Sequence, residues 1–443
     1  MGQSSLFSGR NGPVTDVHTI NVQLAANAYP VYLGRGLLSD RSLWRQHLGG
    51  GKVLIVSNDT VAPLYLETLR TGLDGRVDNV HIIPDGERHK TVETWYGIVD
   101  TLIGMQARRD ATVIALGGGV VGDISGFAAA CYMRGIRFIQ APTTLLAQVD
   151  ASVGGKTAIN HVRGKNLVGA FHQPEAVIID TSTLATLDGR EFAAGLAEVV
   201  KYGAIGDAGF FDWLESEAPS IIANEAGALD QIIRCSVQNK AQVVAADERE
   251  AGLRALLNFG HSFGHAIEAE THFERFLHGE AVAIGMVVAA QLSENRGLCQ
   301  PGAAARVAGL LSRFGLPVRI PDDISVPGLA RALELDKKAL ASGVRLILLR
   351  GIGDAIVDAD SSEDEIVGAM LRNQGAAGVD GVSLERFAAL QVDGRRVHQP
   401  ILRAVDIGRL VQLAQLHQES DGAGRVFGPL AEFGCLAQLP HGL

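Results

Sequence analysis

The chain has 443 residues, a formal net charge of −10, 47% hydrophobic residues and 20% charged residues. This length allows two or more domains with full hydrophobic cores, and the composition is that of a folded globular protein. The acidic balance gives no support for binding to nucleic acid or to an anionic membrane, because both favour a basic face.

The first 189 residues alternate between strand-like and helix-like patterns. After a polar stretch over 1–13, we predict strands at 20–24, 52–57, 79–83, 111–116, 137–140 and 176–180, and helices at 60–71, 91–105 and 124–132. Alternating strands and helices favour parallel pairing. We therefore predict an α/β dinucleotide-binding domain with a mostly parallel sheet and helices on both faces.

The pattern changes at about Arg190. Residues 190–372 are dominated by long helical runs rich in Ala, Leu and Val, with one late strand-like run at 344–349. This indicates a mainly α-helical domain. Its candidate metal ligands and the family resemblance, both described below, assign metal and substrate binding to it. Residues 373–443 are rich in Gly, Ala and Gln, with one predicted helix at 404–417, and we interpret them as a C-terminal extension.

The cysteines and the apolar runs predict the location of the protein. Cys131, Cys235, Cys299 and Cys435 are far apart and form no CxxC pair, which suits reduced thiols better than disulfides or a zinc ribbon. The N-terminus lacks the apolar core of a signal peptide, and no apolar run reaches membrane-spanning length. We expect a cytoplasmic protein without a membrane or nucleic-acid partner.

A glycine turn follows the predicted strand at 111–116. Its pattern, Gly117-x-Gly119-x-x-Gly122, matches the dinucleotide fingerprint, in which the backbone and a helix N-terminus receive a phosphate. The acidic residue expected about 20 residues later for the ribose is missing, so a tight turn without a ligand is the alternative. The polar residues at 57–60, and Glu87 with Lys90, are placed to serve the nucleotide instead.

Three histidines and a glutamate form a possible metal site. His261 and His265 are four residues apart on one helix face, His278 follows, and Glu198 lies in an apolar helical run. Two histidines and a carboxylate with open positions are typical of catalytic zinc. Spacing favours the His261–His265 pair but does not decide which two histidines bind. The alternatives are histidines without metal and, for Glu198 with Lys201, a solvated ion pair.

Nine ordered sequence blocks carry a resemblance to a known family. They lie at 84–90, 117–123, 137–144, 148–156, 164–171, 195–201, 257–265, 278–282 and 336–338, and they include Pro-Asp-Gly-Glu-Arg-His-Lys, Asn-Phe-Gly-His-Ser-Phe-Gly-His and Asp-Lys-Lys. Together they span roughly residues 17–372 and resemble the 3-dehydroquinate synthases, which belong to the sugar-phosphate cyclases. Residues 373–443 lie outside the family pattern, so we expect truncation after Arg372 to preserve activity.

The resemblance implies an NAD site and a site for Zn²⁺ or Co²⁺. The implied metal ligands are Glu198, His261 and His278, which overrides the spacing argument and gives His265 a role near the substrate, in proton transfer or phosphate contact. At Asn58 the family usually has an aspartate. The residues implied for NAD are Asn58, Glu87, Lys90, Gly118, Gly119, Asp123, Thr143, Thr144, Lys156 and Lys165.

The resemblance also implies the reaction and the substrate contacts. The substrate would be the sugar phosphate 3-deoxy-D-arabino-heptulosonate 7-phosphate, converted to 3-dehydroquinate and phosphate while NAD takes up and returns a hydride. Arg134 would reach a neighbouring subunit's site, which implies a homodimer. The implied substrate contacts are Arg134, Asp150, Lys156, Asn166, Lys201, Lys240, Arg254, Asn258 and either Lys337 or Lys338.

Within that set, two groups would bind the two anionic ends of the substrate. Lys156, Asn166, Arg134 and Asn258 would hold the phosphate, and Lys240 with Arg254 the carboxylate. For Arg254, the alternative is a surface pair with Glu250 at i, i+4. The alternatives for the whole protein are a cyclase that makes a cyclitol and a metal-dependent polyol dehydrogenase, with a non-catalytic binding module a weaker third.

Overall fold

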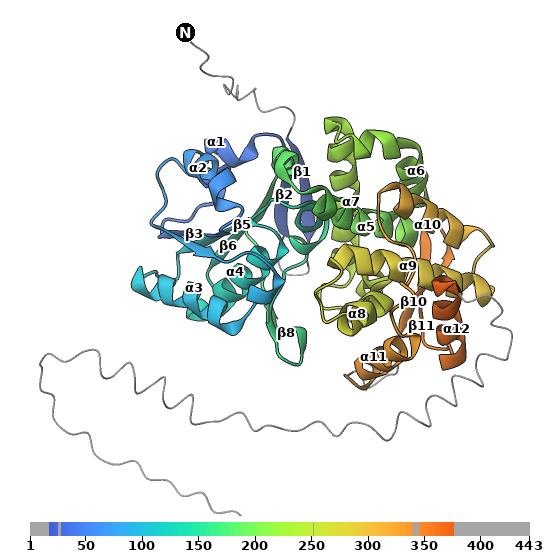
Figure 1. Ribbon diagram of the computed structural model, residues 1–443. Helices are drawn as coiled ribbons and strands as arrows, with labels where there is room; N and C mark the ends of the chain where they lie inside the picture. Colours follow the sequence, from blue (N-terminus) through green and yellow to red (C-terminus); the bar gives the residue numbers. More distant parts are fainter. Residues whose placement is uncertain (1–16, 25–27, 251, 340–344, 376–443) are drawn as a thin grey trace, which may run out of the picture. The chain divides into compact units, whose positions relative to one another are not determined.

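The computed structural model describes residues 17–24, 28–250, 252–339 and 345–375, without the side chains of 334–339 (Figure 1). They lie within the first of two units into which the chain divides, Met1–Leu384. The predicted polar stretch, the predicted helix at 404–417 and Cys435 fall outside the described residues. So do the side chains of Lys337 and Lys338, so neither of these lysines can be placed in a site.

Among the described residues, seven strands form one sheet in the order β1-β2-β9-β6-β5-β3-β4. The strands are β1 (His18–Gln23), β2 (Ala28–Gly34), β3 (Val53–Asn58), β4 (Asn79–Ile83), β5 (Thr112–Gly117), β6 (Arg137–Pro142) and β9 (Ala176–Asp180). Only β1 and β2 pair antiparallel, and every other neighbouring pair is parallel. The mostly parallel sheet is therefore confirmed, and β2 is a strand that the sequence pattern did not predict.

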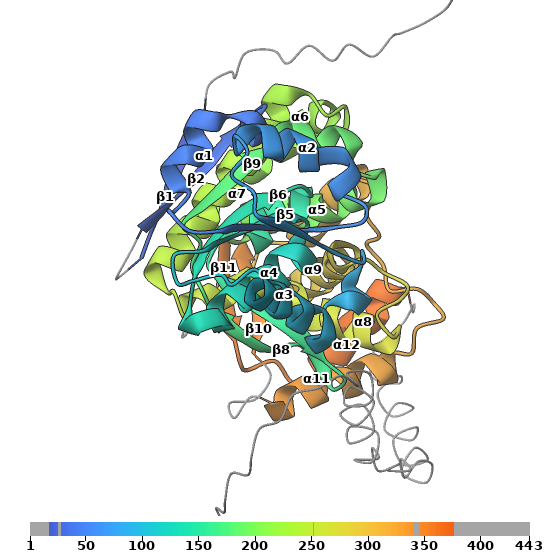
Figure 2. The same cartoon turned by 90° about the vertical axis from the view of Figure 1, so that its left-hand side faces the viewer.

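The sheet is buried because helices cover both of its faces (Figure 2). In β3, Leu54 and Val56 pack in one core with α3 (Val92–Gly104) and α4 (Gly119–Cys131). The alternate residues, Val53 and Ile55, pack in a second core with α1 (Arg41–His47) and α2 (Ala62–Gly72). Burial on both faces explains why this strand is an unbroken apolar run rather than an alternating one.

The strand order of the sheet reverses at β3. From β3 the chain first adds β4 on one side, then crosses to β5 on the other. Ligands of such sheets bind at the carboxyl ends of the strands that flank this reversal. Asn58 ends β3, and the glycine turn follows β5 with α4 starting at Gly119, five residues earlier than predicted.

A hairpin that the sequence did not predict leaves the sheet. It consists of β7 (Lys156–His161) and β8 (Gly164–Phe171), which pair antiparallel. Much of β8 is exposed, including Leu167 and Val168. Because most of β8 is exposed, its sequence lacks the apolar alternation that predicts a half-buried strand.

From residue 189 the chain is mainly helical, as predicted. The helices are α5 (Gly189–Gly206), α6 (Ala208–Ile222), α7 (Ala226–Ala246), α8 (His261–Glu270), α9 (His278–Asn295), α10 (Ala303–Arg313), α11 (Val326–Ala339) and α12 (Glu363–Gln374). The predicted late strand is β10 (Leu346–Gly351), which pairs antiparallel with β11 (Asp354–Asp358). Within the described ranges, no helix combines the length and apolarity needed to span a membrane.

Two glycines of α9 allow its neighbours to approach closely. A Cβ on Gly279 would lie 2.0 Å from the carbonyl oxygen of Ala194 in α5. A Cβ on Gly285 would lie 2.1 Å from the carbonyl oxygen of Gly260, the residue before α8. These contacts bring α5 and the N-termini of α8 and α9 together, and each of the three carries one predicted metal ligand.

The last described helix extends beyond the predicted boundary at Arg372. Asn373 is 3% exposed, its side chain donates to the carbonyl of Val318 (3.0 Å) and it accepts from the amide of Ile320 (2.8 Å). Gly375 then closes α12 in the left-handed conformation that favours glycine. The structural end of this helix is therefore Gly375.

We expect a chain that ends at Gly375 to keep full activity and stability, and one that ends at Arg372 to be less stable by about 2 kcal/mol or more. The loss arises because the partners of Asn373 would be left unsatisfied. Urea denaturation of the two truncated proteins and the full chain measures the difference. Equal midpoints for the two truncated proteins would contradict this account of Asn373.

Candidate active site

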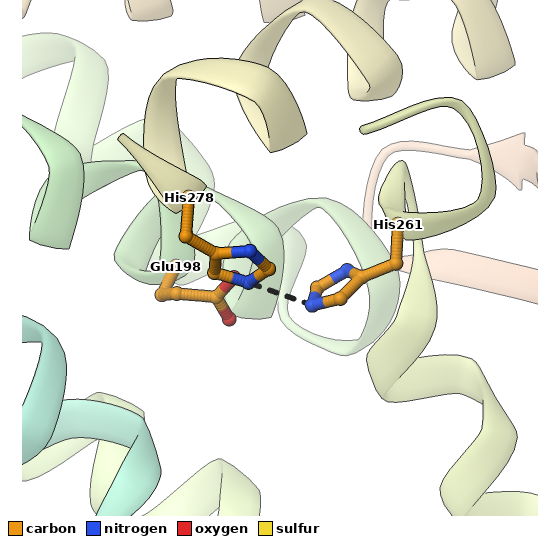
Figure 3. A group of neighbouring side chains, drawn as sticks. All are labelled: Glu198, His261 and His278. Carbon is orange, nitrogen blue, oxygen red and sulfur yellow. Dashed lines mark ion pairs between the residues drawn. The ribbon is translucent and has the colours of Figure 1, made fainter. Parts of the chain in front are cut away.

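Three predicted metal ligands converge in the helical half (Figure 3). Glu198 lies within α5, His261 begins α8 and His278 begins α9, and one potential ligand atom from each lies within 4.8 Å of the others. Nε2 of His261 lies 3.7 Å from Oε1 of Glu198. The ring centroids of His261 and His278 are 5.2 Å apart. The arrangement has the donor set of a catalytic zinc site.

Glu198 is suited to a cation by its surroundings. Its side chain is buried, and neither carboxylate oxygen has a hydrogen-bond partner among the described residues, although the Lys201 ammonium lies against Oε2. A buried carboxylate is costly unless its charge is balanced. The solvated ion pair considered as an alternative for Glu198 and Lys201 is wrong, because both side chains are 1% exposed.

The protonation of His261 also fits a metal ligand. Burial and the nearby positive charge of Lys201 hold the pKa of His261 well below its ordinary value. The imidazole is therefore neutral at pH 7, and the neutral form is the one that binds metal. For Lys201, burial alone would lower the pKa, but the Glu198 and Asp150 carboxylates raise it above the ordinary value.

A second group of possible ligands shares His278. It consists of His265, Glu268 and His278. His265 is exposed, and its ring centroid lies 5.6 Å from that of His261 and 5.9 Å from that of His278. Glu268 already pairs with Lys165 at 3.0 Å. One oxygen of Glu268 already accepts a hydrogen bond from Lys165, whereas neither oxygen of Glu198 has a hydrogen-bond partner among the described residues, so the first group fits a metal better than the second.

Two lysines and a tyrosine surround Asp150, which lies in the short helix η4 (Ala147–Ala151). Lys240 of α7 donates to the Asp150 side chain at 2.8 Å and to its carbonyl at 2.6 Å, and Lys201 lies 3.9 Å from the same carboxylate. The hydroxyl of Tyr202 donates to it at 2.6 Å. The family resemblance implied Asp150, Lys201 and Lys240 as substrate contacts, and the structure places the three side chains together.

The ionisable side chains in this group shift one another's pKa values. Burial alone would raise the pKa of Asp150, but Lys240 and Lys201 hold it well below its ordinary value. Burial lowers the pKa of Lys240 to about 8, although Asp150 works in the opposite direction. The group therefore holds buried positive charge beside the candidate metal site, where an anionic substrate group would be stabilised.

Glu250 occupies the group predicted to bind phosphate. Its carboxylate pairs with Lys156 of β7 and accepts a hydrogen bond from Asn258 at 3.0 Å. Burial alone would raise the pKa of Glu250, but Lys156 and Asn258 lower it below the ordinary value. Because Lys156 and Asn258 both bind the carboxylate of Glu250, the same two side chains are able to bind another anion in its place. Asn166 is not paired with Lys156 but accepts from Lys90 at 2.6 Å.

Arg254 is buried rather than paired at the surface. It is 2% exposed in η6 (Leu253–Asn258) and donates to the carbonyls of Glu248 at 2.6 Å and Gly154 at 3.1 Å. The predicted alternative, a surface pair with Glu250, is therefore wrong. Gly154 has a φ of +98°, a conformation that favours glycine, and a Cβ on it would lie 2.5 Å from Nη2 of Arg254.

The glycine turn has the features of a phosphate cradle. Gly118 precedes α4 without a side-chain cap, so the first amides of that helix are open to a ligand. A Cβ on Gly118 would lie 3.1 Å from Cγ2 of Thr144, which is tighter than an ordinary van der Waals contact. The hydroxyl of Thr143 is buried and has no hydrogen-bond partner among the described residues. These features fit a dinucleotide pyrophosphate.

Charged and polar side chains gather beside the turn. Lys90 is 4% exposed and pairs with Asp123 of α4 at 2.5 Å. Glu87 accepts from Asn160 of β7 at 2.7 Å, and Asn58 donates to Asp85 at 2.6 Å. The predicted NAD residues thus lie at the carboxyl ends of the strands and along the hairpin, while Lys165 instead pairs with Glu268 of α8.

Sequence reasoning missed four polar side chains of this region. They are Asp85, Tyr202, Glu250 and Glu268. Only Glu268 carried a usable signal, since it lies three residues after His265 and seven after His261 on one helix. Arg134 is exposed on η3 (Tyr132–Arg134), and in the described part of the chain no hydrogen bond or ion pair joins it to the other candidates.

Comparison with known proteins gives consistent matches. The family models for the N-terminal and C-terminal parts of 3-dehydroquinate synthase match residues 80–194 and 195–339. A 3-dehydroquinate synthase from Nitrosococcus oceani is 53% identical over 340 residues, which cover 76% of this chain and 94% of the relative. About a quarter of this chain therefore lies outside that match.

Two solved structures share the fold. A 2-epi-5-epi-valiolone synthase from Streptomyces hygroscopicus subsp. jinggangensis, with NAD⁺ and Zn²⁺ bound, is 34% identical with a TM-score of 0.73 and covers 79% of this chain and 98% of its own. A 2-deoxy-scyllo-inosose synthase complexed with carbaglucose-6-phosphate, NAD⁺ and Co²⁺ is 26% identical with a TM-score of 0.73 and covers 80% and 100%.

Proposed function

The chain belongs to the 3-dehydroquinate synthase family, and on that premise we propose which residues carry its reaction. The enzyme is an NAD- and metal-dependent lyase that converts 3-deoxy-D-arabino-heptulosonate 7-phosphate to 3-dehydroquinate and phosphate. Residues 1–189 would form the NAD-binding domain and 190–372 the metal and substrate domain. The observation that supports this assignment best is the convergence of Glu198, His261 and His278 beside two buried lysines.

Glu198, His261 and His278 would hold the metal, Zn²⁺ or Co²⁺. When bound, the metal would supply Lewis acidity toward the hydroxyl groups of the substrate. Lys201 balances the charge of Glu198 and, with Asp150, fixes the position of the buried charges around it. His265 is exposed beside the two ligand histidines, where it can exchange protons with substrate and solvent.

The glycine turn and the strand ends would hold NAD. When bound, NAD would supply a hydride acceptor that is restored within each turnover. The open amides at the start of α4 and the Thr143 hydroxyl would receive the pyrophosphate, and Asn58 would face the adenosine end. Lys90 and Asp123 form a rigid pair between the strand ends and the hairpin.

The substrate has two anionic ends, and two separate cationic groups would bind them. Lys156 and Asn258 would take the phosphate after displacing Glu250, whose carboxylate now holds both. Arg254 and Lys240 would take the carboxylate. The guanidinium has five N–H donors, and the two carbonyl contacts of Arg254 leave others for a ligand.

The pKa of Lys240 predicts the alkaline limit of the reaction. Because burial lowers this pKa to about 8, the ammonium is present below that pH and lost above it. We expect kcat/KM to fall above about pH 8, since kcat/KM reports groups of the free enzyme. The Lys240→Arg variant keeps its charge and should move the limb to higher pH. If kcat/KM of that variant fell at the same pH as in the wild type, a group other than Lys240 would be responsible for the alkaline fall.

We propose a homodimer in the cytoplasm. In the family, the arginine that matches Arg134 reaches the neighbouring subunit's site, and Arg134 is exposed here. In the described residues Cys131, Cys235 and Cys299 are free thiols, which suits a reducing compartment. Sedimentation equilibrium tests the dimer.

Product identification tests the proposed function. The purified protein, NAD⁺ and Zn²⁺ are incubated with 3-deoxy-D-arabino-heptulosonate 7-phosphate, and the products are identified by NMR. We expect equal amounts of 3-dehydroquinate and phosphate, without accumulation of NADH. Net NADH without phosphate would indicate a polyol dehydrogenase. Turnover of a heptulose phosphate that lacks the carboxylate, in place of the keto acid, would indicate a cyclitol-forming cyclase.

A further inference from the structure

We propose that Glu268 is a positioning residue for the metal site, because its carboxylate lies beside Nδ1 of His278 and leaves Nε2 of that ring for the metal. Oε2 of Glu268 lies 3.5 Å from Nδ1 of His278. This inference rests on the proposed metal site, in which His278 is a ligand and Glu268 is not.

Each ligand histidine has an oxygen atom beside its Nδ1, at hydrogen-bond distance for His261 and at 3.5 Å for His278. Nδ1 of His261 lies 3.2 Å from the carbonyl oxygen of Phe259, as Nδ1 of His278 lies beside Glu268. A neutral imidazole that donates from Nδ1 presents its lone pair at Nε2. Each ring therefore has an acceptor on one nitrogen, and the other nitrogen is available to the cation. An acceptor on the nitrogen that does not bind the metal orients the ring of a ligand histidine.

Glu268 is a buried carboxylate whose charge is balanced by its neighbours. The side chain is 2% exposed on α8, and a carboxylate in such a place is costly unless it is paired. Its partners are His278 on one oxygen and Lys165 on the other, at 3.0 Å. Lys165 comes from β8, so the carboxylate joins the hairpin to a ligand of the candidate metal site.

Lys165 is itself held in place. Its Nζ lies 4.5 Å above the centre of the Phe273 ring, a residue that follows α8. The lysine therefore contacts the helical half through a ring and a carboxylate together. This fixes the oxygen of Glu268 that faces away from His278, and it leaves the other oxygen directed at the imidazole.

Zinc affinity tests the inference. Metal-free protein and its Glu268→Gln variant are titrated with Zn²⁺ in competition with a chromophoric chelator. We expect the variant to bind zinc about 10- to 100-fold more weakly, which is the usual loss when the group that orients a ligand histidine is removed. Glu270→Gln, on the same helix but outside both ligand groups, is the matched control and should bind like the wild type.

A spectrum separates positioning from loss of structure. The Co²⁺-loaded Glu268→Gln variant should show the visible absorption bands of the wild type with altered intensity. The bands should remain because all three ligands are still present, and their intensity should change because the His278 ring is less constrained. Equal zinc affinity in the variant and the wild type would overturn the inference. If that happens while His261→Ala loses zinc, the proposed metal site stands and only the role of Glu268 is wrong.

A measurement on the unaltered protein covers the case in which Glu268→Gln does not fold. Long-range ¹H–¹⁵N NMR of the zinc-loaded wild type reports which nitrogen of each histidine is protonated. We expect Nδ1 of His278 to carry a proton and Nε2 to bind the metal. Coordination of His278 through Nδ1 would overturn the inference, because that nitrogen would then not donate to Glu268.

Discussion

The His261→Ala variant should lose its zinc and lower kcat by about 10³-fold or more. Metal ions supply several kcal/mol of transition-state stabilisation, and each 1.4 kcal/mol is worth a factor of ten. His261 is half-buried beside Glu198 and contributes one of the three potential ligands there. With two ligands left, the site should not retain zinc through dialysis. Metal analysis of the dialysed protein measures the loss, and steady-state kinetics measures the rate.

His265→Ala is the matched control for that variant. Its ring lies 5.6 Å from that of His261 on the same helix, but it belongs only to the second group of possible ligands. We expect this variant to keep its zinc and to turn over more slowly, because a group that exchanges protons near the substrate is gone. Zinc lost from His265→Ala and kept by His261→Ala would reverse the assignment of the two histidines.

The second large effect should come from Arg254→Gln. A charge-assisted hydrogen bond to the substrate carboxylate is worth about 1.5–3 kcal/mol. We therefore expect kcat/KM for the heptulosonate phosphate to fall by about 10- to 150-fold, at about 1.4 kcal/mol per factor of ten. Initial rates at low substrate concentration give this ratio directly. The zinc content should stay unchanged, because Arg254 is not among the possible ligands.

Burial makes a stability control necessary for Arg254→Gln. The guanidinium holds the carbonyls of Glu248 and Gly154, so the variant will lose stability as well as a substrate contact. An analogue without the carboxylate separates the two effects, since the wild type and the variant should turn it over equally. If the variant matched the wild type on the natural substrate, the carboxylate role of Arg254 would be refuted.

Much of the fold was predictable because its sheet is buried on both faces. Strands such as β5 and β9 are continuous apolar runs bounded by polar turns, and their sequence signal is strong. The hairpin β7–β8 was not predicted, because its exposed strand has no hydrophobic periodicity. No pattern in the sequence indicated that helix α12 continues past Arg372, because the buried role of Asn373 depends on contacts with a distant segment.

The site was predictable where glycines and histidines recur at short spacing. The glycine turn and the three histidines stand out in the sequence by their spacing, and Glu198 by its place in an apolar helical run. The family resemblance then selected His261 and His278, rather than the His261–His265 pair, as the ligand histidines. A single carboxylate such as Glu250 carries no such pattern, and Glu268 carries only its spacing from the two histidines of its own helix. Their roles come from partners about 90 to 100 residues away, Lys156 and Lys165, which only the folded chain brings into contact.

Anomalous diffraction at the zinc absorption edge, from crystals of the zinc-loaded protein, tests the central claim most directly. The account predicts a single strong peak about 2.0–2.2 Å from a carboxylate oxygen of Glu198 and from one nitrogen each of His261 and His278. A peak surrounded instead by His265, Glu268 and His278, the second group that the structure brings together, would contradict it.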